Sequence, residues 1–79
     1  MEINEPIDLY AVFKKGKIIP LAFKWHGQKH VVDDITIAYT QRDGVYMIYH
    51  FSLLAKDTYY SISIHGKDNA ARLNHIEYQ

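Results

Sequence analysis

The sequence contains no cysteine, which excludes disulfide bonds, thiolate metal sites and cysteine nucleophiles. Small secreted domains usually depend on such cross-links, so a cytoplasmic location is expected. No apolar run approaches the ~18 residues that a transmembrane helix needs. Met1 leads directly into Glu2, Asn4 and Glu5 rather than into a signal peptide. We therefore expect no membrane partner for this chain.

An excess of charge of either sign is also missing, because nine basic residues balance nine acidic ones. A neutral domain lacks the electrostatic field expected of a protein that coats DNA. The charges are unevenly spread, however. No acid occurs between Leu9 and Val32, and five lysines lie in that interval.

What the sequence does contain is a high proportion of residues that suit β-strands. Hydrophobic residues make up 48% of the 79 residues, too many for a disordered chain, and Ile and Tyr dominate among them. The length allows a single domain, residues 1–79, with a small core. No segment keeps a 3.6-residue period, so the composition predicts an all-β protein.

Turn residues divide the chain into short segments with two-residue alternation, as strands require. Gly or Asp occurs at each break, where tight turns need a positive φ or a local side-chain hydrogen bond. The expected strands are residues 7–13, 17–25, 28–40, 45–54, 58–65 and 72–78. This pattern predicts an antiparallel meander of about six strands, curled into a small barrel or a strongly bent sheet.

The register of the first hairpin follows from the need to bury one face. A three-residue loop, Lys14 to Gly16, pairs Phe13 with Lys17 and Leu9 with Leu21. A two-residue loop would put apolar groups on both faces, so the longer loop is preferred. The inward set is then Ile7, Leu9, Ala11, Phe13, Ile19, Leu21, Phe23 and Trp25.

The later segments divide into an inner and an outer face in the same way. A two-residue turn at Lys56-Asp57 aligns two inward sets, which are Val45, Met47, Tyr49, Phe51 and Leu53, and Tyr60, Ile62 and Ile64. Segment 28–40 changes its alternation at Asp33-Asp34, which predicts a β-bulge there. Such a bulge brings two sets inward, His30 and Val32 before it and Ile35, Ile37 and Tyr39 after it.

One run resembles a known group of proteins. Residues 20–30 read PLAFKWHGQKH, which is similar to the pattern P-x-x-F-x-W-x-G-x-x-Y of a group of small uncharacterised bacterial β domains. His30 departs from that pattern, where an aromatic residue is expected. Some members of such groups are encoded beside error-prone DNA polymerases, so the resemblance implies a link to DNA repair. Physically, the motif predicts that Phe23 and Trp25 point inward and that residue 30 packs opposite Phe23.

Chemistry-bearing residues are sparse. Five histidines suggest a metal site, for which the candidates are His50, His65 and His75. Zinc needs three or four converging ligands, and surface histidines on a polar strand face are the commoner case, so we expect no metal and no cofactor. Asp33 and Asp34 are adjacent on a strand and point to opposite faces, which disfavours acid–base work. No nucleophile motif is present, so we expect no enzyme activity.

Two binding surfaces remain. Small barrels bind single-stranded nucleic acid through a basic groove with aromatic platforms, and the candidate lysines are Lys14, Lys15, Lys24 and Lys29. They crowd two hairpin ends that a meander places apart. The other surface is an outer face with Tyr46, Ile48 and Tyr59, of the kind that contacts proteins. An exposed edge strand could also add to the sheet of a partner.

We therefore expect a non-enzymatic binding or accessory module that acts through protein–protein contacts, either as a homodimer or with another protein. Weak binding of single-stranded nucleic acid is the alternative.

Overall fold

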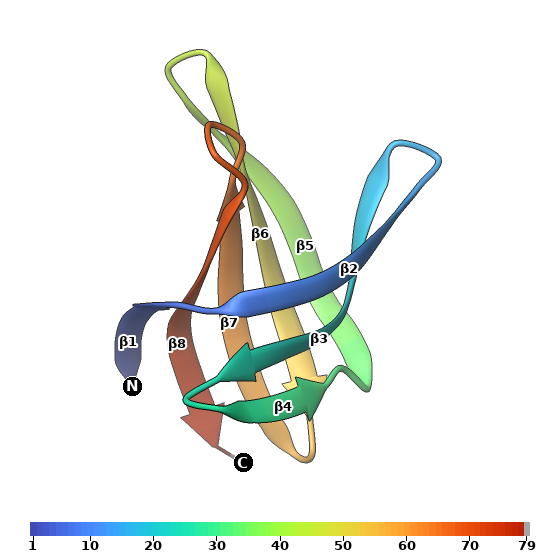
Figure 1. The fold of residues 1–79 in the computed structure, drawn as a ribbon, viewed down its shortest axis with the longest axis vertical. Coiled ribbons are helices and arrows are strands. Elements are labelled where there is room, and N and C mark those ends of the chain that lie inside the picture. Colours follow the sequence, from blue (N-terminus) through green and yellow to red (C-terminus); the bar gives the residue numbers. More distant parts are fainter. Residues whose placement is uncertain (79) are drawn as a thin grey trace.

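A computed structural model describes residues 1–78, and these residues form eight β-strands and no helix. The strands are β1 (Glu2–Pro6), β2 (Asp8–Lys14), β3 (Lys17–Trp25), β4 (Gln28–Val31), β5 (Asp34–Asp43), β6 (Tyr46–Ala55), β7 (Thr58–His65) and β8 (Ala70–Tyr78). They pair into a five-stranded antiparallel sheet, ordered β1-β8-β7-β6-β5, and a three-stranded antiparallel sheet, ordered β2-β3-β4. Figure 1 shows the smaller sheet lying across the larger one.

The prediction of an all-β antiparallel fold is confirmed, but its details need correction. Residues 1–78 contain eight strands rather than six, and their two sheets do not close into a barrel. Consecutive strands still pair within each sheet, as a meander requires. The unpredicted strand is β1, which crosses from the start of the chain to pair with β8 near its end.

The predicted single strand 28–40 is wrong because it is two strands in different sheets. β4 pairs with β3, and after Val32 and Asp33 the chain enters β5, which pairs with β6. The Val32 amide donates to Leu21 O at 2.9 Å, and the Asp33 amide donates to Leu54 O at 2.8 Å. The first hydrogen bond ties Val32 to the three-stranded sheet, and the second ties Asp33 to the five-stranded sheet. Asp33 therefore lies at the corner where the chain passes between the sheets, and the predicted β-bulge is not there.

The bulge of this segment lies later, between Ile35 and Ile37. Thr36 is the extra residue, and its hydroxyl donates to Ser52 O at 3.2 Å. Because a bulge shifts the alternation by one residue, Ile35 packs against the core while Ile37 and Tyr39 are each 57% exposed. The prediction that Ile37 and Tyr39 point inward is therefore wrong.

The predicted register of the first hairpin is also wrong. Lys14 pairs with Lys17 across a two-residue turn, so Phe13 faces Ile18. Further along the hairpin, Ala11 pairs with Pro20 but Tyr10 pairs with Ala22, which leaves Leu21 as the extra residue of a β-bulge in β3. Beyond the bulge, Leu9 pairs with Phe23. A two-residue turn was disfavoured because it would put apolar groups on both faces of the hairpin. The bulge reverses the alternation of β3, so that Ile18 on one side of the bulge and Phe23 on the other both pack against the core. Leu21 is left exposed, and Phe13, on the part of the hairpin that projects beyond the core, is 78% exposed.

The hairpin of β6 and β7 agrees with its predicted register. Ala55 pairs with Thr58 across the turn at Lys56-Asp57, both of which have positive φ. The exception is Val45, which precedes β6 and is 83% exposed at the hairpin tip.

The core lies between the two sheets, and the five-stranded sheet supplies most of it. From the smaller sheet, Phe23 is fully buried, with its ring centroid 5.0 Å from that of Tyr60 on β7. The buried cluster is Phe23, Phe51, Leu53, Ala55, Tyr60, Ile62, Ile64, Leu73 and Ile76. Burying such side chains contributes about 1.5–3 kcal/mol each, which makes this cluster the main source of stability.

Candidate interaction surface

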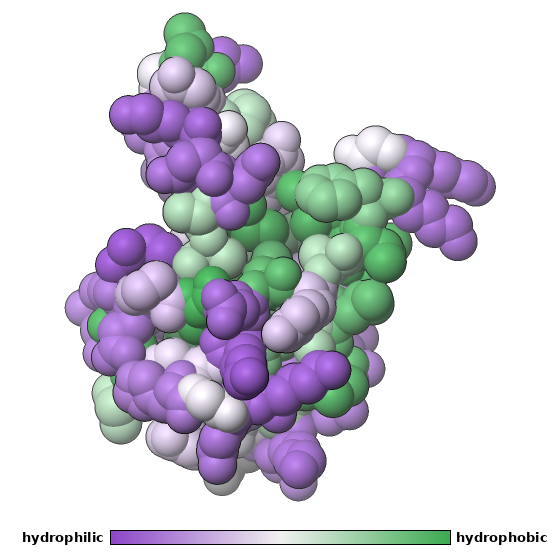
Figure 2. Space-filling view, viewed as in Figure 1, coloured by the Kyte–Doolittle hydropathy of each residue, from purple (hydrophilic) through white to green (hydrophobic). Residues whose placement is uncertain are grey.

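The outer face of the three-stranded sheet, called the front face below, is not covered by any other strand of residues 1–78. Tyr10, Ala22 and Val31 form one row across it, and Val12 lies two residues further along β2 on the same side. Tyr10, Val12 and Val31 are all exposed. Figure 2 shows apolar residues gathered over the β2–β3 hairpin in this view. This half of the front face is therefore an apolar patch.

The other half of the front face carries the predicted lysines Lys24 and Lys29, which pair with each other across β3 and β4. Asp8 completes their row, since it pairs with Lys24 from β2. The Lys29 ammonium lies 5.3 Å from the centroid of the Tyr10 ring, within the range of a cation–π contact. An acid and two lysines in one row make this end mixed in charge rather than strongly basic.

Lys14 and Lys15 lie at the opposite end of the same sheet, at the tip of the β2–β3 hairpin. Lys17 and Lys24 are separated by seven residues of β3, or about 23 Å at ~3.3 Å per residue. The structure thus keeps the two predicted groups of lysines apart, and they do not line one groove.

Tyr46, Ile48 and Tyr59 belong to the five-stranded sheet, on the face turned away from the core. Ile48 pairs with His65 at one end of β7, and Tyr59 lies near the other end, opposite Leu54. Six residues of β7 separate these positions, about 20 Å at ~3.3 Å per residue. The predicted set is therefore divided between the two ends of one face.

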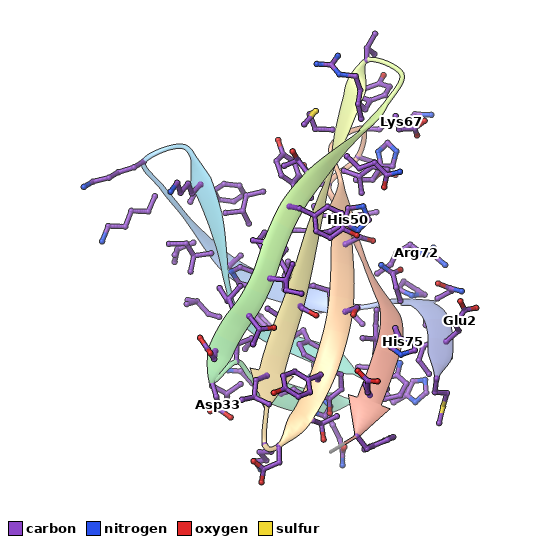
Figure 3. The ribbon with its side chains drawn as sticks, turned by 180° about the vertical axis from the view of Figure 1, so that it is seen from behind. Glu2, Asp33, His50, Lys67, Arg72 and His75 are labelled. Carbon is purple, nitrogen blue, oxygen red and sulfur yellow. The ribbon has the colours of Figure 1, made fainter. Side chains whose placement is uncertain are left out.

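The histidines proposed as metal ligands are each engaged by a different neighbour. His50 Nε2 lies 2.9 Å from Gln41 Oε1, and the His50 ring stacks on Tyr39 at 4.6 Å between centroids. His75 Nε2 is 3.4 Å from the Met1 amino group. Figure 3 shows His50 and His75 apart on the rear of the sheet.

Both ring nitrogens of His65 make hydrogen bonds within the chain. Its Nδ1 accepts the Lys67 amide at 3.1 Å, so the proton is on Nε2, which donates to Asp43 Oδ2 at 2.9 Å. Within residues 1–78, no three histidine, aspartate or glutamate side chains are grouped as a metal site would require.

Asp33, one of the two carboxylates considered for acid–base chemistry, makes a structural contact. Asp33 Oδ2 accepts the Lys56 amide at 2.9 Å, which supports the turn between β6 and β7. Ser63 lies opposite His50, and its Oγ accepts a hydrogen bond from Asn74 Nδ2 at 2.9 Å.

A polar cluster joins the two sheets at the end of the β3–β4 hairpin. Trp25 Nε1 and His26 Nε2 both donate to Glu5 Oε1, at 3.1 and 2.7 Å. The indole hydrogen bond, followed by that of His26, holds the pKa of Glu5 below its usual value. No sequence pattern indicated this cluster, because Glu5 lies outside every predicted strand.

The motif residue His30 occupies the place that the pattern predicts. It pairs with Phe23, and the two rings stack at 4.9 Å between centroids. Burial lowers the pKa of His30, and the charge of Lys56 adds to this effect. Its Nε2 is buried and has no hydrogen-bond partner among residues 1–78.

The feature that sequence reasoning did not locate is the edge formed by β5. Within residues 1–78, β5 pairs only with β6, and nine of its ten residues are exposed. The other edge strands are shorter. β1 carries Pro6, β4 has four residues including Lys29, and β2 ends in Lys14. Proline, lysine and shortness hinder unwanted strand pairing, as bulges and other charges also do. β5 has ten residues without proline or lysine, and its bulge and charged residues lie toward its two ends.

Comparison of the chain with models of protein families, with curated proteins and with solved structures finds no match. None of the residues that the structure describes belongs to a helix suited to crossing a lipid bilayer.

Proposed function

We propose that this protein is a non-enzymatic binding module that acts through protein–protein contacts, with a second copy of itself as a partner. One observation supports this above all others. Among residues 1–78, large apolar side chains are exposed mainly on the three-stranded sheet and β5. These residues are Tyr10, Val12, Phe13, Leu21, Val31, Ile37 and Tyr39.

The exposed residues form separate groups on different sides of the molecule. Tyr10, Val12 and Val31 lie on the front face, whereas Ile37 and Tyr39 lie on the side of β5 that is turned away from the core. Single apolar side chains at a surface are ordinary, but a group of them favours contact with another protein. Tyr10 and Tyr39 add to this argument, because tyrosine combines a large contact area with a polar tip. The resemblance to bacterial β domains, with its implied link to DNA repair, is compatible with an accessory role and adds no residue to the surface.

Binding of single-stranded nucleic acid has weaker support. The contact of the Lys29 ammonium with the Tyr10 ring suits a nucleic acid. However, Asp8 lies in the same row as Lys24 and Lys29, and Lys14 and Lys15 lie at the far end of the sheet. A nucleic-acid groove needs an uninterrupted basic path along the backbone.

The test is the molar mass of the purified chain, measured by light scattering over about three decades of concentration. The proposal expects the mass to rise from 9.3 kDa toward twice that value. A mass that stays at 9.3 kDa at every concentration contradicts it. A gel shift with a single-stranded oligonucleotide at low salt serves as the parallel test of the alternative.

A further inference from the structure

The free edge of β5 offers a partner more than apolar side chains, because its outward backbone groups have no ladder partner among residues 1–78. Unpaired amides and carbonyls in a row are a template for another strand. Figures 1 and 3 show β5 at the margin of the five-stranded sheet, on the side away from β8 and β1. The front face, in contrast, offers side chains alone.

We propose that β5 pairs antiparallel with β5 of a second copy, centred on Ala38, so that two five-stranded sheets join into one. This inference rests on the proposed function, since it names the place where the two copies meet. A two-fold axis through the paired Ala38 residues closes the assembly at two chains.

The charges of β5 select the antiparallel arrangement. Asp33 and Asp34 lie at the start of the strand and Arg42 lies at its end. The Arg42 guanidinium makes no ion pair or hydrogen bond within residues 1–78, whereas the neighbouring Asp43 is held by His65. A parallel copy would place the acids of the two chains together. An antiparallel copy brings Arg42 of each chain to the acidic end of the other.

The bulge at Thr36 does not remove this complementarity. From Ile37 to Arg42 the pairing with β6 continues without a shift, so the centre of the edge is regular. Because the bulge reverses the alternation, Asp33 shares the inner face of the sheet with Arg42, whereas Asp34 lies on the outer face. Asp33 is therefore the acid that comes opposite Arg42 of the second copy, and Asp34 adds charge of the same sign at that end of the strand.

Side chains near the centre also suit a copy of themselves. Pairing about Ala38 sets Ile37 of one chain opposite Tyr39 of the other, twice by symmetry. An aromatic ring opposite a β-branched residue is a favourable cross-strand pair. Tyr39 is already stacked on His50, so its ring is held in place before the second copy arrives.

An apolar groove runs beside this edge on its inner side. Ala38 and Thr40 of β5 line it together with Ile18, Tyr49 and Phe51. A strand added to β5 extends the sheet over this opening and removes apolar surface from water, which backbone pairing alone would not do.

The first experiment reverses the charges at the two ends of β5. Arg42→Glu brings an acid to the acidic end of the second copy, and Asp34→Arg brings a cation to the end of β5 that Arg42 of the second copy approaches. Each variant is expected to weaken the dimer, Arg42→Glu about tenfold in Kd and Asp34→Arg by less, because Asp34 lies on the other face from Arg42. The combined variant Asp34→Arg/Arg42→Glu again sets opposite charges at the two ends and is expected to bind more tightly than Arg42→Glu alone. Lys67→Glu, an exposed change of the same size on the β7–β8 turn, is the matched control.

The second experiment uses the absence of cysteine from the chain. Ala38→Cys places a single thiol beside its own symmetry mate, so mild oxidation is expected to give a covalent dimer. Ala70→Cys, at an exposed position of β8, is the matched control and is expected to form no covalent dimer. Circular dichroism of each variant establishes that the β fold is retained.

The outcomes separate the two proposals. If the wild type is dimeric but charge reversal leaves Kd unchanged and Ala38→Cys crosslinks no faster than Ala70→Cys, the β5 interface is wrong while self-association stands. If the wild type is monomeric at all concentrations, the proposed function itself is overturned.

Discussion

β7 and β5 are strands of similar pattern with different surroundings. Each alternates bulky residues with small or polar ones, and both lie in the five-stranded sheet. In β7, Tyr60, Ile62 and Ile64 are buried, because the strand has neighbours on both sides and Phe23 packs over it. In β5 only Ile35 packs against the core. Alternation therefore indicates which side chains share a face, but not whether that face is covered.

The largest expected effect on stability distinguishes a buried residue of β7 from an exposed residue of β5. Ile62→Ala removes a side chain that is 1% exposed and is expected to lower the free energy of unfolding by about 3 kcal/mol. Ile37→Ala, on the exposed part of β5, is the matched control and is expected to cost under about 0.5 kcal/mol. Urea denaturation at low protein concentration measures both. Equal losses of unfolding free energy in the two variants would contradict the exposure of Ile37 on β5.

A second prediction compares the ends of two hairpins. A Cβ at Gly66 would lie 2.7 Å from the carbonyl oxygen of Met47, which also accepts the Gly66 amide. Gly66→Ala must therefore move the backbone of β6 or lose that bond, and is expected to cost about 2 kcal/mol. Val45→Ala, at the exposed tip of the β5–β6 hairpin, is expected to leave the free energy of unfolding nearly unchanged. Urea denaturation measures both variants.

The contact of β4 with β7 predicts a dependence on pH. The pKa of His30 is lower in the native state than in the unfolded chain, so the native state binds fewer protons between the two values. The stability from this group is present above the unfolded value of about 6.5 and is lost as pH falls toward the native one.

His30→Phe tests this. It keeps a ring against Phe23 and removes the unpartnered Nε2, but it also removes the contact of Nδ1 with the Tyr60 hydroxyl at 3.5 Å, so its stability at pH 7 is expected to stay within about 1 kcal/mol of the wild type. It should also lessen the loss of stability between about pH 7 and pH 5 relative to the wild type. A variant that loses stability as steeply as the wild type over this range contradicts the assignment.

The smallest effect is expected at the polar cluster of Glu5. The pKa of Glu5 is lowered by the hydrogen bonds from Trp25 and His26, so its contribution is present above the unfolded pKa and is lost as pH falls through the native one. Because the Glu5 side chain is 44% exposed, solvent screens its interactions, and Glu5→Gln is expected to reduce stability only slightly near neutral pH and not at all in acid. Glu77→Gln is the control, and chemical denaturation at two pH values is the measurement.

Prediction from sequence succeeded where a strand has close neighbours in the chain. The hairpin of β6 and β7 was correct in its turn and, except for Val45, in its inward residues, and Phe23 and His30 pair as the motif indicated. In these hairpins the turn itself fixes the register, and one buried face leaves no other choice.

Prediction from sequence failed where a single extra residue shifts the inward–outward alternation of a strand. Leu21 and Thr36 each add one residue to a strand, and each bulge reverses the faces of the residues beyond it. Neither residue is a glycine or a proline, so nothing local marked the site, although Pro20 precedes Leu21. The candidate surface was predicted only in part for the same reason, since its exposed residues Ile37 and Tyr39 were assigned to the core.

Local alternation and turn chemistry determined that this chain is all-β, where most of its hairpins turn, and which residues fill the centre of its larger sheet, because these depend on neighbours within a few residues. Only the tertiary structure decided that the chain changes sheets at Asp33, that β1 joins β8, and that β5 is left with a free edge. These features depend on contacts between distant segments, whose cost in chain entropy is offset only when the whole core assembles.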